Sequence, residues 1–67
     1  MTYSVTIIGL GYVGLPLAQE ACRAGLKVTG LDIDSGVVAG LANGASHLDD
    51  LDSNDIVEMQ ESGFVAT

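Results

Sequence analysis

The sequence predicts an α/β fold built on a parallel β-sheet, because short β-branched runs alternate along the chain with segments of helical periodicity. Glycines stand at the boundaries between these segments, and 67 residues suffice for one small domain. We therefore expect residues 1–67 to form the N-terminal part of a doubly wound, Rossmann-type parallel sheet with strand order 3-2-1, truncated before its second half.

The first strand and the first helix are indicated by a change in the spacing of apolar residues along the chain. Ser4–Ile8 is a β-branched run of the kind found in buried parallel strands. From Gly11 or Tyr12 to residue 24, apolar side chains recur every three or four positions, which is typical of a helix with one buried face. Pro16 is compatible with that start because the first four amides of a helix have no acceptor within it. Gly25 suits the left-handed position after the last turn.

The second strand and the second helix follow directly. Lys27–Leu31 reads as a short strand that closes at Asp32, so the first half of the chain is a strand-helix-strand unit with a right-handed crossover. Asp34 or Ser35 is expected to cap a second helix that runs to about Asn43.

A third helix and a third strand are expected in the last part of the chain. Asp52 and Asp55, three residues apart, resemble a capping box, and Gly63 suits the end of the helix. Residues 64–66 form the expected third strand. If the chain keeps winding in one direction, this strand pairs with the second one and gives the order 3-2-1.

A glycine-rich turn lies between the first strand and the first helix. It fits the pattern G-x-G-x-x-G with the residues Gly9-Leu10-Gly11-Tyr12-Val13-Gly14. Gly9 permits a tight turn, Gly11 leaves room for a pyrophosphate, and Gly14 lets the helix pack closely on the strand. Free amides at the positive end of the helix dipole then face the phosphates. The pattern in this context predicts a dinucleotide-binding loop.

An aspartate at the end of the second strand selects the cofactor. Asp32 follows Gly14 by 18 residues, close to the spacing of about 20 at which a carboxylate takes the adenosine ribose hydroxyls. It favours NAD and repels the 2′-phosphate of NADP. Asp34 is either a second ligand or the cap of the next helix. The predicted cofactor-binding residues are Gly9, Gly11, Tyr12, Val13, Gly14 and Asp32.

The charge balance argues against nucleic acid and anionic membranes as partners, since nine acidic residues face two basic ones and the net charge is −7. We interpret the acidic segment as a solvated helix face with its flanking loop, and it comprises Asp49, Asp50, Asp52, Asp55, Glu58 and Glu61. The sequence has no apolar run of membrane-spanning length and no secretory signal, which indicates a cytoplasmic protein.

The lone cysteine and the lone histidine are given no role in binding or catalysis. Cys22 stands inside the first helix without a partnering base, so we interpret it as a small apolar residue. His47 has no metal companion, nucleophile or base nearby in the sequence and is expected to be a merely solvated loop residue. One cysteine forms no disulfide within the chain, which fits a reduced compartment.

Beyond the glycines, the chain resembles the opening of the UDP-glucose/GDP-mannose dehydrogenase family. The most specific stretch runs Ile7-Ile8-Gly9-Leu10-Gly11-Tyr12-Val13-Gly14-Leu15-Pro16-Leu17-Ala18. The likeness continues through residues 28–34, Leu41, Gly44, Ser46, Asp49 and Asp50, and then residues 63–67. One departure is Val37, which stands where the family usually has a lysine or arginine near the adenosine.

This resemblance implies a cytosolic oxidoreductase that uses two NAD molecules and a thioester on a cysteine of a later domain. Such enzymes oxidise the C6 alcohol of a nucleotide sugar to a carboxylate for polysaccharide synthesis. The serine and acid pattern is more similar to enzymes acting on UDP-N-acetylhexosamines than to those acting on UDP-glucose. The family's phosphate loop matches residues 9, 11, 12, 13 and 14, its ribose ligand matches Asp32, and no catalytic position of the family maps here.

Three functional interpretations stay open on the sequence. The first is the NAD-binding N-terminal fragment of a nucleotide-sugar 6-dehydrogenase, which lacks the substrate site for turnover. The second is a non-catalytic dinucleotide-binding module or truncated gene product. The third is another NAD-dependent Rossmann enzyme. In each case the first strand has an open edge that permits homodimerisation.

Overall fold

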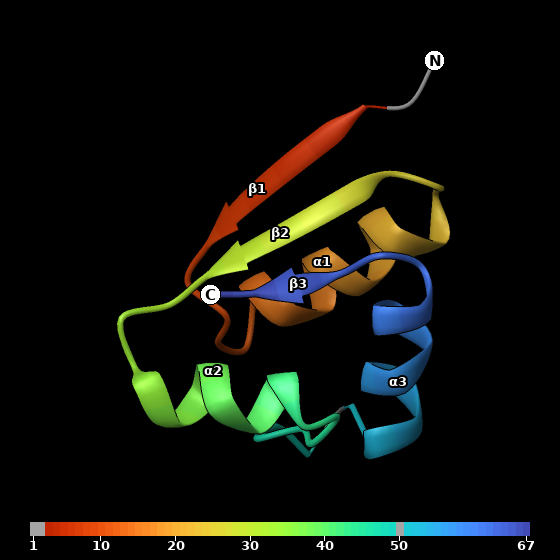
Figure 1. Ribbon diagram of the computed structural model, residues 1–67. Coiled ribbons are helices and arrows are strands. Elements are labelled where there is room, and N and C mark those ends of the chain that lie inside the picture. The colour runs from red at the N-terminus through yellow and green to blue at the C-terminus, as the bar shows by residue number, and fades with distance from the viewer. Residues whose placement is uncertain (1–2, 50) are drawn as a thin grey trace.

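A computed structural model describes residues 3–49 and 51–67 (Figure 1). Strands and helices alternate, with two helices between the second and third strands. The elements in chain order are β1 (Ser4–Ile8), α1 (Gly14–Arg23), β2 (Lys27–Leu31), α2 (Ser35–Ala42), α3 (Ser53–Glu61) and β3 (Val65–Ala66). The predicted α/β fold is confirmed.

The three strands form one parallel sheet in the order β1-β2-β3. Strand β1 pairs with β2 from Ser4 opposite Lys27 to Ile8 opposite Leu31. Strand β3 continues the sheet beyond β2, with Val65 opposite Thr29. This arrangement is the predicted order 3-2-1 read from the other edge. The third strand is shorter than the expected residues 64–66, because its pairing with β2 begins only at Val65, and Phe64 before it lies in the core.

Helix α1 begins at Gly14, two or three residues later than expected. The Leu15 amide donates to the Gly11 carbonyl, but Pro16 has no amide for the carbonyl of the next residue, so regular helix bonding resumes only when Leu17 donates to Val13. Residues 11–13 therefore form a turn, which leaves the glycine loop separate from the helix. At the other end, Gly25 has φ of +86°, the predicted left-handed position.

Side-chain caps set the starts of the other two helices. Asp34 Oδ1 accepts from the amides of Gly36 and Val37, at 2.9 and 3.3 Å, so this aspartate is the cap of α2. Asp52 and Asp55 form the predicted capping box, in which each side chain accepts from the other residue's amide.

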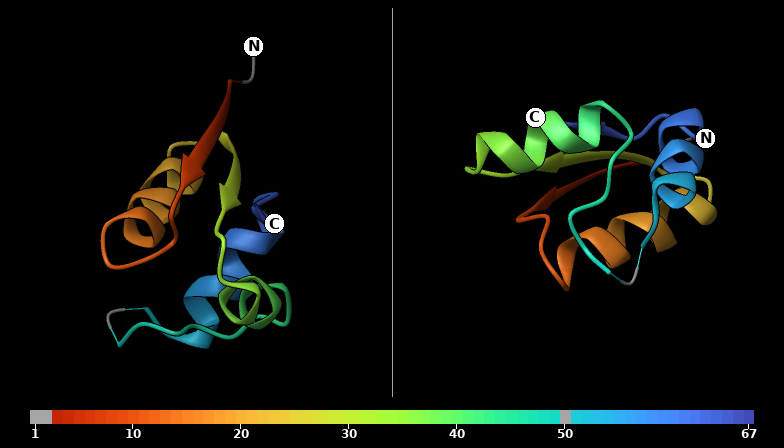
Figure 2. Two further views of the ribbon diagram at one scale, coloured as in Figure 1. Left: turned by 90° about the vertical axis from the view of Figure 1, so that its left-hand side faces the viewer. Right: turned by 90° about the horizontal axis from the view of Figure 1, so that it is seen from below.

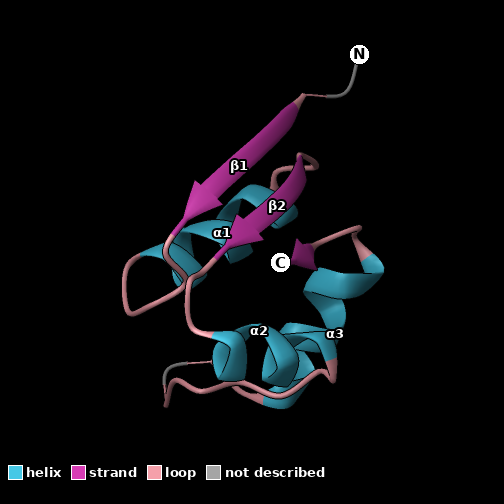
Figure 3. Cartoon of the chain, turned by 60° about the vertical axis from the view of Figure 1, so that its left-hand side comes forward, coloured by secondary structure: helices cyan, strands magenta, loops and turns pink. Residues whose placement is uncertain are grey.

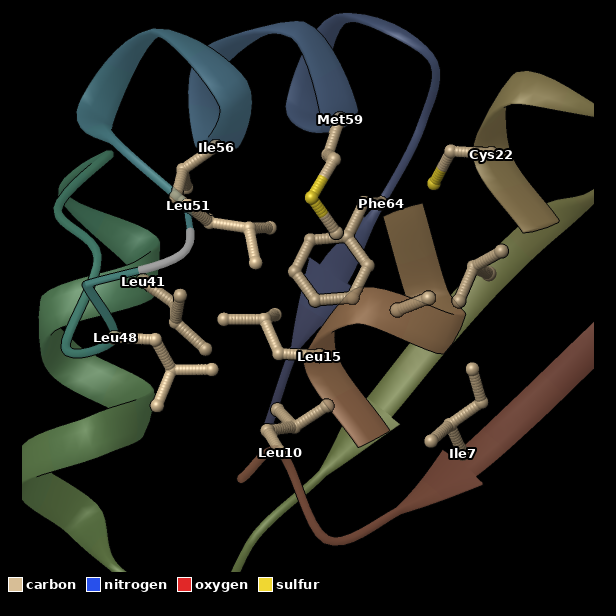
Figure 4. Close-up of a cluster of buried hydrophobic side chains, with 12 residues drawn as sticks. Ile7, Leu10, Leu15, Cys22, Leu41, Leu48, Leu51, Ile56, Met59 and Phe64 are labelled. Atoms are coloured by element: carbon tan, nitrogen blue, oxygen red, sulfur yellow. The ribbon is translucent and has the colours of Figure 1, made fainter. Parts of the chain in front are cut away.

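Helix α1 lies along β1 and β2, and α2 and α3 lie toward the β3 edge of the sheet (Figures 1 and 2). The side chains between sheet and helices form a single apolar cluster, which Figure 4 shows converging around Leu15 and Phe64. Its most deeply buried members are Leu10, Leu15, Val28, Leu41, Ile56 and Met59. The opposite sheet face is open in the described part of the chain, with Ile8 83% and Val65 54% exposed. One covered face and one open face are what half of a doubly wound sheet presents.

The exposure of the acidic segment agrees with its interpretation as a solvated helix face with a flanking loop. Asp49, Asp52, Glu58 and Glu61 are exposed, Asp55 is partly covered, and Asp50 lies outside the described residues. Within residues 3–49 and 51–67, no helix is long and apolar enough to cross a membrane.

Candidate dinucleotide-binding site

The glycine loop lies at the carboxyl ends of β1 and β2, where both strand arrows in Figure 3 point. Gly9 leaves β1 with φ of +90°, a conformation that residues with a side chain rarely adopt. Its amide donates to the carbonyl of Leu31 at 2.7 Å, which keeps the loop joined to β2. The turn therefore needs glycine at this position, as the sequence predicted.

Gly14 brings α1 against the loop. A Cβ atom on this residue would lie 1.7 Å from the carbonyl oxygen of Gly9 and 3.5 Å from Cγ2 of Ile7. No side chain fits at such a distance. The close approach of helix to strand that the sequence predicted for Gly14 is confirmed.

Gly11 has open space beside it, as Gly9 has, but unlike Gly9 it has no positive φ. A Cβ atom built on Gly11 would meet no atom within 4 Å. The amides of residues 11–14 donate to no acceptor within residues 3–49 and 51–67, and they stand before the first turn of α1. Unpaired amides at a helix N-terminus with open space beside them are suited to an anion such as a phosphate.

The Tyr12 and Val13 side chains point into solvent, with 75% and 80% of their surfaces exposed. Neither residue belongs to the buried apolar cluster. Their amides are among the unpaired amides of residues 11–14.

Asp32 joins the glycine loop to the end of β2. Its Oδ2 accepts from the Leu10 amide and its Oδ1 from the Asp34 amide, each at 2.8 Å. These amides, the Leu10 amide foremost, together with the nearby charge of His47, hold the pKa of the Asp32 carboxyl below its usual value. The half-buried carboxylate is thus fixed in place and ionised beside the loop, and Asp34 is turned away to cap α2.

Leu10 is a residue of the site that the sequence analysis passed over. It is fully buried, although it lies between two glycines of the loop. A Cβ atom on Gly30 would lie 2.5 Å from its side chain, so the glycine within β2 makes room for it. The available signal was a glycine inside a short strand, which often marks such a close approach.

His47 is a second residue whose position was not foreseen. Its Nε2 lies 2.6 Å from the carbonyl oxygen of Leu10, across 37 positions of sequence. The expectation of a merely solvated histidine is wrong, although the ring remains largely exposed. No local pattern in the sequence could have found this contact, because the fold alone brings the two segments together.

Cys22 is buried in the apolar cluster on α1, as expected of a small apolar residue. Burial raises the pKa of its thiol, which keeps the thiol protonated and unreactive. In the described residues, 3–49 and 51–67, no group of acidic, histidine or cysteine side chains could hold a metal ion.

A cavity of about 620 Å³ opens beside the carboxylate at the strand ends. Its lining is mainly apolar and consists of Ile8, Gly9, Leu31, Asp32, Ile33 and Thr67. Ile33 is fully exposed, so it presents a bare apolar side chain next to the ionised Asp32. A flat, largely apolar group linked to hydroxyls fits this combination.

A parallel sheet, a glycine loop before a helix, and a carboxylate at the next strand end together define a Rossmann-type dinucleotide-binding fold. Residues 3–66 match the sequence profile described as the NAD-binding domain of the UDP-glucose/GDP-mannose dehydrogenase family. The chain belongs to this family, and the cofactor of the domain is NAD.

Similar proteins share both sequence and structure with the chain. The UDP-N-acetyl-D-glucosamine 6-dehydrogenase of Pseudomonas aeruginosa is 40% identical over 60 residues, and the UDP-N-acetyl-D-mannosamine dehydrogenase of Yersinia pestis is 33% identical over 60. Each match covers 90% of this chain and 14% of the enzyme. The UDP-N-acetyl-mannosamine dehydrogenase structure from Staphylococcus aureus superposes on 96% of this chain with a TM-score of 0.85 and 30% identity. The chain spans 16% of that structure.

Proposed function

We propose that residues 1–67 form the N-terminal part of the NAD-binding domain of a nucleotide-sugar 6-dehydrogenase. The NAD-binding residues in this proposal are Gly9, Gly11, Tyr12, Val13, Gly14 and Asp32. The observation that carries the proposal is the open space at Gly11, bordered by the unpaired amides of residues 11–14 and the anchored carboxylate of Asp32. These features supply donors for two phosphates and an acceptor for ribose hydroxyls within one continuous surface.

The pyrophosphate, the adenosine ribose and the adenine of NAD each have a matching group in this site. The amides of residues 11–14 donate to the pyrophosphate, helped by the positive end of the α1 dipole. A carboxylate has about four lone-pair positions, and Asp32 uses two of them for the amides of Leu10 and Asp34. The remaining two accept from the adenosine ribose hydroxyls. The adenine then lies in the apolar cavity against Ile33.

For the substrate, we propose a UDP-N-acetylhexosamine, oxidised at C6 from the alcohol to the carboxylate. Support comes from the names of the relatives, which describe dehydrogenases of UDP-N-acetylmannosamine and UDP-N-acetylglucosamine. With one water molecule supplying the second carboxylate oxygen, the oxidation transfers two hydrides to two NAD+ molecules and releases three protons. Within the whole enzyme, the part proposed for this chain is to bind and orient the dinucleotide.

The cofactor site is tested by calorimetric titration of NAD into the chain and its Gly11→Ala variant. We expect saturable binding by the unaltered chain and a dissociation constant at least about tenfold higher in the variant, because the new methyl group occupies the phosphate position. Stability should be unchanged or slightly raised, since no atom lies within 4 Å of that Cβ and φ is not positive.

A matched control is Gly40→Ala in α2, where the new Cβ would make an ordinary 3.8 Å contact with the carbonyl of Ala45. This control should bind NAD as the unaltered chain does. Equal affinity of all three folded proteins would contradict the assignment of the phosphate site to Gly11.

The place of this chain in a nucleotide-sugar dehydrogenase is tested by a chimaera in which it replaces the matching residues of the Pseudomonas aeruginosa enzyme. We expect the chimaera to form NADH when supplied with UDP-N-acetylglucosamine, and the same chimaera carrying Gly11→Ala to be at least about tenfold less active at limiting NAD. A folded chimaera that binds NAD without turnover would instead favour a non-catalytic dinucleotide-binding module.

A further inference from the structure

The loop between α2 and α3 holds His47 in a defined position over the glycine loop. The Ser46 hydroxyl accepts from the Leu48 amide at 3.1 Å and donates to the Leu48 carbonyl at 3.0 Å. Leu48 itself is buried in the apolar cluster. The residues on both sides of His47 are therefore tied down, and the imidazole is presented toward Leu10 by a constrained segment.

The contact between His47 and Leu10 is a hydrogen bond with only one possible direction. A carbonyl oxygen accepts and cannot donate, so His47 carries its proton on Nε2 and donates it across the 2.6 Å distance to the Leu10 oxygen. This requirement is met by the neutral Nε2–H tautomer and by the imidazolium alike.

Leu10 is consequently held at three points. Its side chain is packed against Gly30 in the core, its amide donates to Asp32, and its carbonyl accepts from His47. The first two contacts fix the residue and the peptide before it. Among residues 3–49 and 51–67, only the bond from His47 acts on the peptide that follows.

That following peptide joins Leu10 to Gly11 and contains the first amide of the open loop. The described residues contain no cis peptide bond, and in a planar trans peptide the carbonyl and the next amide point in opposite directions. When the Leu10 oxygen is drawn to His47, the Gly11 N–H is turned to the other side of the peptide plane. Glycine offers little resistance to rotation of this plane, so an external contact is needed to fix it.

We infer that His47 is a positioning residue for NAD: by donating from Nε2 to the Leu10 carbonyl, it orients the Leu10–Gly11 peptide and presents the Gly11 amide to the pyrophosphate. This inference rests on the proposed function of the loop. It makes residues 46–48, which lie outside the glycine motif, part of the cofactor site. The charge of His47 that lowers the pKa of Asp32 is consistent with its place beside both halves of the site.

The test compares NAD binding by the unaltered chain with His47→Ala and His47→Gln. Loss of one hydrogen bond predicts a dissociation constant raised about fivefold in the alanine variant. Gln carries an amide nitrogen near the position of Nε2 and should restore affinity to within about twofold. In nuclear magnetic resonance spectra without NAD, the Gly11 amide signal should shift in the alanine variant and return toward its original position in the glutamine variant.

Asp49→Ala is the matched control, because Asp49 is an exposed residue of the same loop. It should change neither the affinity for NAD nor the Gly11 signal. Unaltered affinity and an unmoved Gly11 signal in His47→Ala, in a chain that binds NAD, would overturn the positioning role alone. Absence of NAD binding by the folded unaltered chain would overturn the proposed function and this inference with it.

Discussion

Gly14→Ala is expected to abolish the native fold of the chain. The added methyl carbon would lie 1.7 Å from the carbonyl oxygen of Gly9, which is a backbone atom and cannot swing aside as a flexible side chain would. Gly9 is itself held by its bond to Leu31, while Leu15 and Ala18 fix α1 in the core. Separating the loop from the helix would cost about 3 kcal/mol or more.

A loss of that size removes most of the stability of so small a domain. Circular dichroism should show no cooperative thermal unfolding in Gly14→Ala, and the dispersion of its amide resonances should collapse. Gly11→Ala is the matched control because it adds the same methyl group three residues away in open space. If both variants melted at the same temperature as the unaltered chain, the close packing of α1 on the Gly9 turn would be contradicted.

The sequence predicted most of the fold because its signals are local. Each strand is a short β-branched run, and each helix start after the first is marked by an aspartate that accepts from amides two or three residues later. The order of strands follows from right-handed crossovers between parallel neighbours. These features depend on residues close together in sequence, so they can be read without knowing the tertiary structure.

The sequence predicted the start of α1 at Gly11 or Tyr12, but the helix begins at Gly14, and the reason is again a nearby residue. Pro16 is tolerated in the first turn of a helix, where an amide has no helical acceptor, but its missing amide leaves the Tyr12 carbonyl without a helical partner. Regular helix bonding therefore begins only after a turn over residues 11–13.

The sequence predicted the glycine motif of the candidate site but not the long-range contacts that hold the loop in place. The spacing of Gly9, Gly11 and Gly14 carries the information that a strand, a turn and a helix meet there. The contacts of Leu10 with Gly30 and with His47 span 20 and 37 positions and arise only when the chain has folded. No periodicity relates such residues, so the sequence alone predicts the glycine loop but not the contacts that hold it.

Asp32→Ala is expected to weaken NAD binding at least about tenfold and to reduce the preference for NAD over NADP. The variant loses the acceptor for the ribose hydroxyls together with the charge that repels a 2′-phosphate. It also frees the Leu10 amide, which loosens the loop from the end of β2. Parallel calorimetric titrations with NAD and NADP measure both effects as a ratio of dissociation constants.

Asp34→Ala separates the role of Asp32 from the general effect of removing an acid at this strand end. Its carboxylate caps α2, so its loss should cost about 1 kcal/mol of stability and leave the NAD to NADP ratio unchanged. If Asp34→Ala altered the NAD to NADP ratio as strongly as Asp32→Ala, the assignment of cofactor selection to Asp32 would be contradicted.

The dependence of stability on pH gives an independent readout for Asp32. The Leu10 and Asp34 amides lower its pKa in the folded chain, so its contribution to stability is complete above the unfolded value near 3.9 and is lost as the pH falls through the lower folded value. The acid limb of the unfolding curve should therefore be shallower in Asp32→Asn than in the unaltered chain. An identical acid limb in the two proteins would show that the carboxylate does not tether the loop, even if it binds the ribose.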